Sequence, residues 1–243
     1  MKPPNPLIVK PFFAYAESLL KRRFDGVGIA QGSLPAFEKL CASQHALIYS
    51  THSSWWDVMI GILIAKRTGL ELRAPMEQKQ LEKYSILRSI GMLGVSESNS
   101  LSFMRNVNEI FSGSRRSGLW ITPQAHFACN REPQPPFKRG LELIARQHPN
   151  VPVFAIAINY EFWNESRPVA VLSIEEVQHA DSEQLRNDLD GLTTTLLAAS
   201  SQRERQNWQW LLDPKPASVW IQDATAQLKS WVTRRSYQAG HLR

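Results

Sequence analysis

The chain has 243 residues, of which 43% are hydrophobic and 21% are charged. This composition excludes an intrinsically disordered protein and fits one α/β domain, with or without a helical extension. The formal net charge of +6 suits an anionic partner such as a phosphorylated cofactor, an anionic membrane or a nucleic acid. No stretch of the sequence approaches the roughly 18 uncharged apolar residues of a spanning helix, and no signal peptide is visible. We therefore expect a cytoplasmic protein that contacts a membrane, if at all, only at its surface.

The first segment, residues 1–30, predicts an amphipathic helix. Apolar side chains recur there at helical spacing, at Phe12, Tyr15, Ala16, Leu19 and Leu20. A basic run at residues 21–23 follows them. The pattern fits a helix that lies in a membrane interface. It fits equally a helix that packs on its own domain and ends with positive charge, as the helix dipole favours.

The central segment, residues 31–180, alternates short apolar runs with helical patterns. Buried strands are predicted at 46–50, 118–121, 151–159 and 168–174, and helices at 57–66 and 137–146. This alternation predicts an α/β domain with a central, mostly parallel sheet flanked by helices.

The last segment, residues 181–243, predicts a helical region packed on the same domain. Four leucines mark an amphipathic helix that Asp181 or Ser182 caps, at Leu185, Leu189, Leu192 and Leu196. A Trp-rich stretch at 208–212 follows, and a final helix is expected at 218–234.

The candidate chemistry lies in residues 51–57, which read THSSWWD. The preceding strand places His52 at the edge of the sheet, where α/β enzymes keep their sites. With His52 in a loop and Asp57 in the first helical turn, the carboxylate can fold back onto the imidazole. Such a pair fixes the tautomer and stabilises the imidazolium that forms when the other ring nitrogen takes a proton.

The sequence contains no Gly-x-Ser-x-Gly nucleophile elbow. A His–Asp pair without its own nucleophile favours general-base activation of a substrate hydroxyl. The alternative is an ordinary loop histidine beside a helix aspartate, because two-residue patterns often arise by chance.

Four blocks in order across residues 45–160 resemble the lysophospholipid and glycerolipid acyltransferase family, of the 1-acylglycerol-3-phosphate acyltransferase type. The family's Asn-His-x4-Asp signature matches at residues 51–57, with Thr51 in place of Asn. The later blocks match at 76–95, at 121–126 followed by Phe-Lys-Arg-Gly at 137–140, and at 151–156. Their order, more than any single block, carries the resemblance.

The resemblance implies an acyltransferase in which His52 deprotonates an acceptor hydroxyl and Asp57 orients His52. It implies acyl-CoA or acyl-carrier protein as cosubstrate, no bound cofactor and no metal. The partners would be a lipid acceptor and, peripherally, the cytoplasmic face of a membrane. The positions predicted to bind substrate are Ser53, Ser54, Trp55, Trp56, Lys79, Gln124, Ala125, His126 and Lys138.

The third block departs from the family, which typically has Phe-Pro-Glu-Gly-Thr where this chain has Gln124, Ala125 and His126. Basic residues of the second and third blocks are associated with the acceptor phosphate in lysophosphatidate enzymes, and Arg105 is the first arginine after the second block. An acceptor phosphate would lose its usual bidentate partner. We therefore hypothesise another lipid-like acceptor, such as a glycolipid or a carotenoid glycoside, besides a lysophospholipid.

Two other functions remain open at this point. A degenerate family member would bind lipid without turnover. A basic nucleic-acid-binding protein is the second alternative, but the basic residues are scattered in short pairs and form no recognised RNA or DNA motif. We expect no nucleic acid among the partners.

Overall fold

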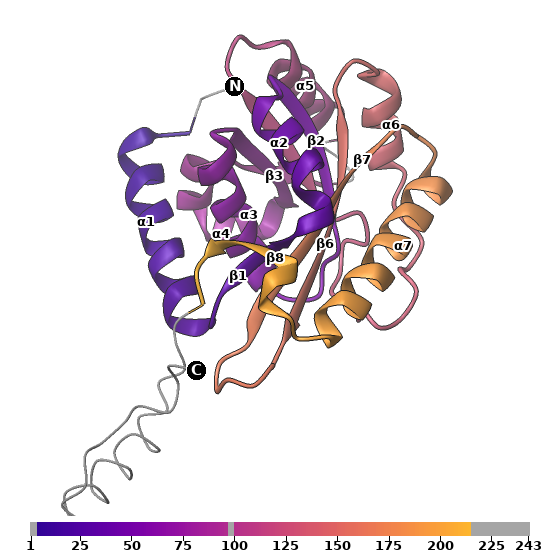
Figure 1. Ribbon diagram of the computed structural model, residues 1–243. Coiled ribbons are helices and arrows are strands. Elements are labelled where there is room, and N and C mark those ends of the chain that lie inside the picture. Colours follow the sequence, from indigo (N-terminus) through magenta and orange to yellow (C-terminus); the bar gives the residue numbers. More distant parts are fainter. Residues whose placement is uncertain (1–3, 97–99, 215–243) are drawn as a thin grey trace, which may run out of the picture.

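Strands and helices alternate along most of the computed structural model, which describes residues 4–96 and 100–214 (Figure 1). The strands are β1 (Val27–Ala30), β2 (His45–Ser50), β3 (Glu71–Glu77), β4 (Met92–Val95), β5 (Ser117–Ile121), β6 (Val153–Glu161), β7 (Val169–Val177) and β8 (Trp208–Leu212). The α-helices are α1 (Pro6–Arg23), α2 (Leu34–Ala42), α3 (Trp56–Thr68), α4 (Gln78–Lys83), α5 (Ser100–Ser112), α6 (Gly140–Gln147) and α7 (Ser182–Ser201). Short 3-10 turns are η1 (Gln31–Ser33), η2 (Ser85–Ile90) and η4 (Arg205–Asn207).

The eight strands form one sheet in the order β4-β3-β5-β2-β6-β7-β1-β8. Pairing is parallel from β4 to β6 and between β7 and β1. It is antiparallel between β6 and β7 and between β1 and the edge strand β8. The predicted α/β class with a mostly parallel sheet is confirmed.

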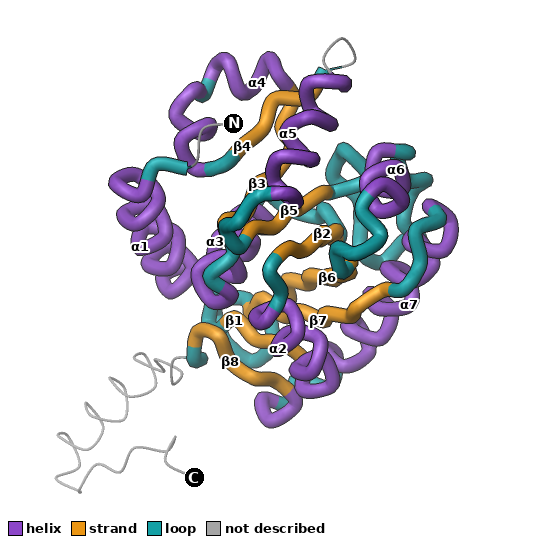
Figure 2. The backbone as a smooth tube through the Cα atoms, turned by 90° about the horizontal axis from the view of Figure 1, so that it is seen from above, coloured by secondary structure: helices purple, strands orange, loops and turns teal. Residues whose placement is uncertain are grey.

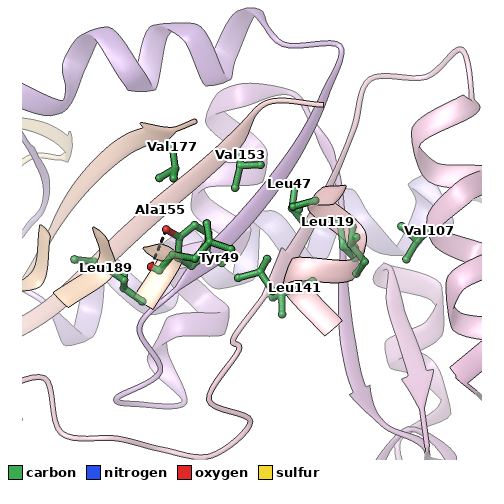
Figure 3. Close-up of a cluster of buried hydrophobic side chains, with 14 of the residues drawn as sticks. Leu47, Tyr49, Val107, Leu119, Leu141, Val153, Ala155, Val177 and Leu189 are labelled. Atoms are coloured by element: carbon green, nitrogen blue, oxygen red, sulfur yellow. Dashed lines mark hydrogen bonds between the residues drawn. The ribbon is translucent and has the colours of Figure 1, made fainter. Parts of the chain in front are cut away.

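Helices cover both faces of the sheet, as Figure 2 shows from above. One apolar cluster joins α1, α2 and α3 to one face, and a second joins α5, α6 and α7 to the other. Figure 3 shows part of the second cluster, with Tyr49 and Leu47 of β2 packed near Leu141 of α6 and Leu189 of α7. Because both faces are buried, the central strands read as continuous apolar runs rather than alternating ones.

The strands predicted in the central segment are all present, within two residues of the expected bounds at their starts. The first helix begins at Pro6, before the apolar pattern that starts at Phe12, because Asn5 caps it and Pro6 occupies its first position. Its apolar face packs on the domain through Ala16 and Leu20, while Leu7 and Tyr15 stay exposed.

The last segment needs one correction. Helix α7 forms as predicted, and the side chain of Asp181 caps it by accepting the backbone N–H groups of Glu183 and Gln184. Residues 208–212, however, form strand β8 and not part of a helical region, because Trp208 is buried and the stretch completes the sheet beside β1. The expected helix at 218–234 lies outside the described residues. Among those that are described, no helix is long and apolar enough to cross a membrane.

The sheet opens beside the predicted site. Strand β3 pairs with β5 through Glu71–Arg73 and then with β4 through Ala74–Glu77. The second half of β3 therefore diverges from β5. The carboxyl ends of β2, β3, β5 and β6 meet at the same edge, since β2, β3, β5 and β6 run in one direction.

Candidate active site

The end of β2 fixes the position of His52. Thr51, the residue after the strand, is fully buried and donates its backbone N–H to the carbonyl of Ile156 at 3.2 Å. Its side-chain oxygen accepts the backbone N–H of Ile158 at 3.0 Å. These two hydrogen bonds hold Thr51 against β6, at Ile156 and Ile158. The direction in which the chain leaves the sheet at His52 is therefore fixed.

The carboxylate of Asp57 lies against His52, as the sequence predicts. Its Oδ2 atom is 3.0 Å from Nδ1 of His52 and accepts the backbone N–H of Ser54 at 3.0 Å. Asp57 is in the first turn of α3 and only 2% of its side chain is exposed, against 20% for His52. A carboxylate only accepts hydrogen bonds, so Nδ1 carries the proton and Nε2 is left as the base.

Tyr160 is a third member of this group, and sequence analysis missed it. Its hydroxyl donates to Oδ1 of Asp57 at 2.6 Å. Burial, together with the neighbouring charge of Asp57, raises the pKa of Tyr160 well above its ordinary value. The two residues are 103 positions apart in the chain, and the Tyr-Glu-Phe sequence at 160–162 matches no motif of known chemistry. Only the parallel pairing of β2 with β6 brings them together.

The loop after β5 packs against the histidine. Ala128 donates its backbone N–H to the carbonyl of His52 at 2.8 Å, and the ring of Phe127 lies 4.5 Å from the imidazole, centroid to centroid. Asn130 donates to Oγ of Ser53 at 3.3 Å and also to the carbonyl of Ile158. This loop therefore packs against the His52 ring and holds the His52 backbone.

Gln124, a predicted substrate-binding residue, points into the protein. Its amide donates to Oε1 of Gln134, and both side chains are almost completely buried. The backbone of Gln134 is in turn held by Asp190 of α7 at 2.7 Å. Gln124 thus anchors the loop to the α7 layer. His126 is exposed and lies outside the cleft described next.

A cleft of about 1510 Å³ opens at this edge of the sheet, with His52 and Asp57 among its walls. One wall is a single face of α3, another is β3, and the third is the start of α1. The apolar residues along it are Val58, Gly61, Ile62 and Ala65 of α3, Leu72, Ala74 and Met76 of β3, and Val9, Phe12 and Phe13 of α1. Trp120 of β5 also contributes to the lining.

The two ends of the cleft carry charged residues. At the edge of the sheet where β2 ends, these are Lys79, which follows β3, and Lys138, in the segment after β5, both exposed. At the other end, Lys66 pairs with Glu17, and Glu71 pairs with Arg73 and with Arg115. The cleft is thus largely apolar and runs from the His52–Asp57 pair to a group of paired charges.

The structure separates the predicted site residues into two groups. His52, Asp57, Lys79, Ala125 and Lys138 line the cleft. The others are not among the residues that line the cleft. Ser54 and Ser53 make the hydrogen bonds given above, Trp56 packs on Phe24, and Trp55 stacks on Trp56 with half of its surface exposed.

Neither the scan against family models nor the search of curated proteins finds a match for this sequence. Within the part of the chain that the structure describes, no group of three or more His, Cys, Asp or Glu residues is placed to hold a metal ion. The features of the protein that bear on function are therefore the geometry of His52 and Asp57 and the cleft beside them.

The loop after β5 contains a strained residue at which a substitution is predicted to stabilise the protein. Ala125 has φ of 60°, a left-handed conformation that costs a non-glycine residue roughly 1–2 kcal/mol. Glycine adopts this conformation without the cost. It also gives the unfolded chain more conformational entropy, which offsets part of the stabilisation. We expect Ala125→Gly to raise the free energy of unfolding by about 1 kcal/mol, measured by urea denaturation.

The control is Ala128→Gly in the same loop, where φ is not positive. That variant should lose about 0.5–1 kcal/mol, because only the unfolded-state entropy changes. A destabilised Ala125→Gly protein would show that residue 125 is not held in the left-handed region.

Proposed function

We propose that this protein is an O-acyltransferase that moves a fatty acyl group from acyl-CoA or acyl-carrier protein to a hydroxyl of a lipid-like acceptor. The observation that carries the proposal is the His52–Asp57 pair, held at 3.0 Å at one end of a long apolar cleft. A general base can activate the hydroxyl of one substrate, and an apolar channel beside it can hold the hydrocarbon chain of the other.

The reaction needs only the groups present. Nε2 of His52 takes the proton of the acceptor hydroxyl while Asp57 stabilises the imidazolium through Nδ1. The acceptor oxygen attacks the thioester carbonyl, and the tetrahedral intermediate then breaks its C–S bond. The departing thiolate takes the proton back from His52, so that the products are an ester and a free thiol. No metal ion and no enzyme nucleophile enter this scheme.

The cleft has the length and polarity for an acyl chain. Helix α3 has 13 residues, and at about 1.5 Å per residue it extends roughly 20 Å. The cleft follows one face of this helix from Asp57 to Gly69. The apolar wall removes the hydrocarbon from water, which contributes about 0.8 kcal/mol for each buried methylene.

Two lysines of the cleft suit the polar part of a substrate. Lys79 and Lys138 line the same cleft as His52, and each would offer an ammonium group to a phosphate of CoA or of the carrier's prosthetic group. The same lysines would serve a phosphorylated acceptor. A glycolipid, a carotenoid glycoside and a lysophospholipid all remain candidate acceptors.

The first prediction concerns the catalytic pair. His52→Ala should lower the rate of acyl transfer by about 10³-fold and Asp57→Asn by about 10²–10⁴-fold, because each removes part of the base. The assay follows thiol release and ester formation from palmitoyl-CoA with a detergent-dispersed glycolipid or lysophospholipid.

The matched control is His126→Ala, which removes an exposed histidine of the third block outside the cleft and should keep full activity. Turnover of His52→Ala at the wild-type rate would contradict catalysis and favour the lipid-binding alternative.

The second prediction concerns the apolar cleft. A Cβ on Gly61 would lie at ordinary contact distance, 3.7 Å, from Trp120, so a larger side chain fits the helix but fills the cleft. Displacing three to four methylenes costs about 3 kcal/mol. We expect Gly61→Leu to lower kcat/KM for palmitoyl-CoA roughly 100-fold, while butyryl-CoA is used at nearly the wild-type rate.

Gly191→Leu adds the same side chain to an exposed site on α7, where a Cβ has no neighbour within 4 Å. It should leave chain preference unchanged. If Gly61→Leu loses activity equally for both acyl lengths, the chain does not lie along α3.

The third prediction concerns the membrane, which we propose the protein meets peripherally at the cytoplasmic face. Leu7 at the start of α1 and Ile86 of η2 are 84% and 63% exposed, and Asn5 donates its N–H to Ser89 at 2.9 Å, which joins the two segments. Lys83 and Arg88 are also exposed there. The Trp-rich stretch is not part of this surface, because Trp208 is buried in β8.

A double change, Leu7→Glu with Ile86→Glu, should reduce flotation with anionic liposomes several-fold, since it removes apolar contact and adds negative charge. Leu143→Glu is the control, because Leu143 is similarly exposed on α6, in the opposite helical layer. Equal flotation of the double variant and the wild type would contradict the proposed surface.

A further inference from the structure

Both oxygens of the Asp57 carboxylate are held by the protein. Oδ2 accepts from Nδ1 of His52 and from the backbone of Ser54, each at 3.0 Å. Oδ1 accepts from the hydroxyl of Tyr160 at 2.6 Å. The bonds to Ser54 and Tyr160 act on different oxygens, so together they fix the plane of the carboxylate as well as its position.

The hydroxyl of Tyr160 is placed as a hydrogen-bond donor to Asp57 and not as an acid or base. A carboxylate offers it no proton, and burial together with the charge of Asp57 raises the pKa of Tyr160 well above its ordinary value. Tyr160 is also not among the residues that line the cleft. It does not touch a substrate there, and any effect on catalysis passes through Asp57.

The ring of Tyr160 is itself fixed by aromatic packing. Phe24, the residue that follows α1, lies 5.7 Å from the Tyr160 ring and 5.0 Å from the ring of Trp56, edge-on in the second case. Trp56 is the first residue of α3, next to Asp57. Side chains from α1, α3 and β6 thus meet behind the carboxylate and leave the phenol little freedom to turn away.

We infer that Tyr160 is a positioning residue for the His52–Asp57 pair: by holding Oδ1 of Asp57, it keeps Oδ2 on Nδ1 of His52. The imidazole then stays in the tautomer with its proton on Nδ1, and Nε2 remains the basic nitrogen. The catalytic meaning of this inference rests on the proposed function. The hydrogen-bond geometry itself can be tested without turnover.

The test compares Tyr160→Phe with Tyr49→Phe. Tyr49 is fully buried and its hydroxyl donates to the carbonyl of Leu185 at 3.1 Å, on the other face of the sheet (Figure 3). Both changes remove one buried hydroxyl from a phenol ring, but only one removes a partner of Asp57. Their melting temperatures show how much of any effect is a general loss of stability.

The direct measurement is the tautomer of His52, read from ¹⁵N NMR shifts of the imidazole in the full chain. The His52→Ala spectrum identifies the His52 signals among those of the six histidines. We expect the Nδ1–H form in the wild type and in Tyr49→Phe, and a second population with the proton on Nε2 in Tyr160→Phe. The same single tautomer in all three proteins would overturn the inference.

The activity measurement is the split between kcat and KM. Loss of a group that orients a catalytic side chain lowers kcat, so we expect Tyr160→Phe to lose about 10–100-fold in kcat with KM for the acyl donor nearly unchanged. Tyr49→Phe should keep the wild-type kcat. An unchanged kcat in Tyr160→Phe would refute the positioning role. If the wild type transfers no acyl group, the proposed function fails, and the NMR result alone decides the role of Tyr160.

A second variant covers the case in which Tyr160→Phe does not fold. Placing 3-fluorotyrosine at position 160 keeps the ring and makes its hydroxyl a stronger donor. The ring-nitrogen signals of His52 should then move, while 3-fluorotyrosine at position 49 should leave them in place. Signals that stay fixed with fluorine at position 160 would show that the phenol does not act on the pair.

Discussion

A buried carboxylate at the junction of a strand and a helix is the constraint on which this site depends. Asp57 is almost fully removed from water, and an unpaired buried charge is among the costliest features that a fold can carry. The fold meets that cost with one donor from the loop, one from the histidine and one from β6. The elements around Asp57 therefore each place a hydrogen-bond donor against its carboxylate. Because Nδ1 of His52 is one of these donors, the same arrangement orients the imidazole.

Thr51 fits the same arrangement. The Thr51 hydroxyl accepts the N–H of Ile158 and the Thr51 backbone donates to Ile156, so β2 is fastened to the strand that also carries Tyr160. A short side chain with one acceptor is enough for this task. The residue at position 51 acts on the alignment of β2 with β6, which sets the distance between Tyr160 and Asp57.

The sequence predicts the central sheet well and the edges less well. Residues 46–50 and 151–159 lie in the middle of the sheet and are apolar on both faces, so their pattern is unambiguous. Strand β3 mixes polar and apolar residues, and part of it lines the cleft, so its sequence does not resemble a buried strand. Residues 208–212 form an edge strand that pairs on one side only, and their aromatic sequence does not indicate a strand. The His52–Asp57 pair was predictable because it is local. Tyr160 was not, since its proximity depends on strand pairing over 103 residues.

The position of the Gln124 side chain changes how residues 124–126 are interpreted. The sequence alone assigned this position to the substrate, so its change from glutamate suggested a rebuilt acceptor pocket. In the structure the side chain faces Gln134 beneath the loop, away from the cleft. A neutral amide there pairs with another neutral amide, and a glutamate would bring a charge into the same buried place. Gln124 therefore helps to anchor the loop to the α7 layer, whereas Lys79 and Lys138 line the cleft.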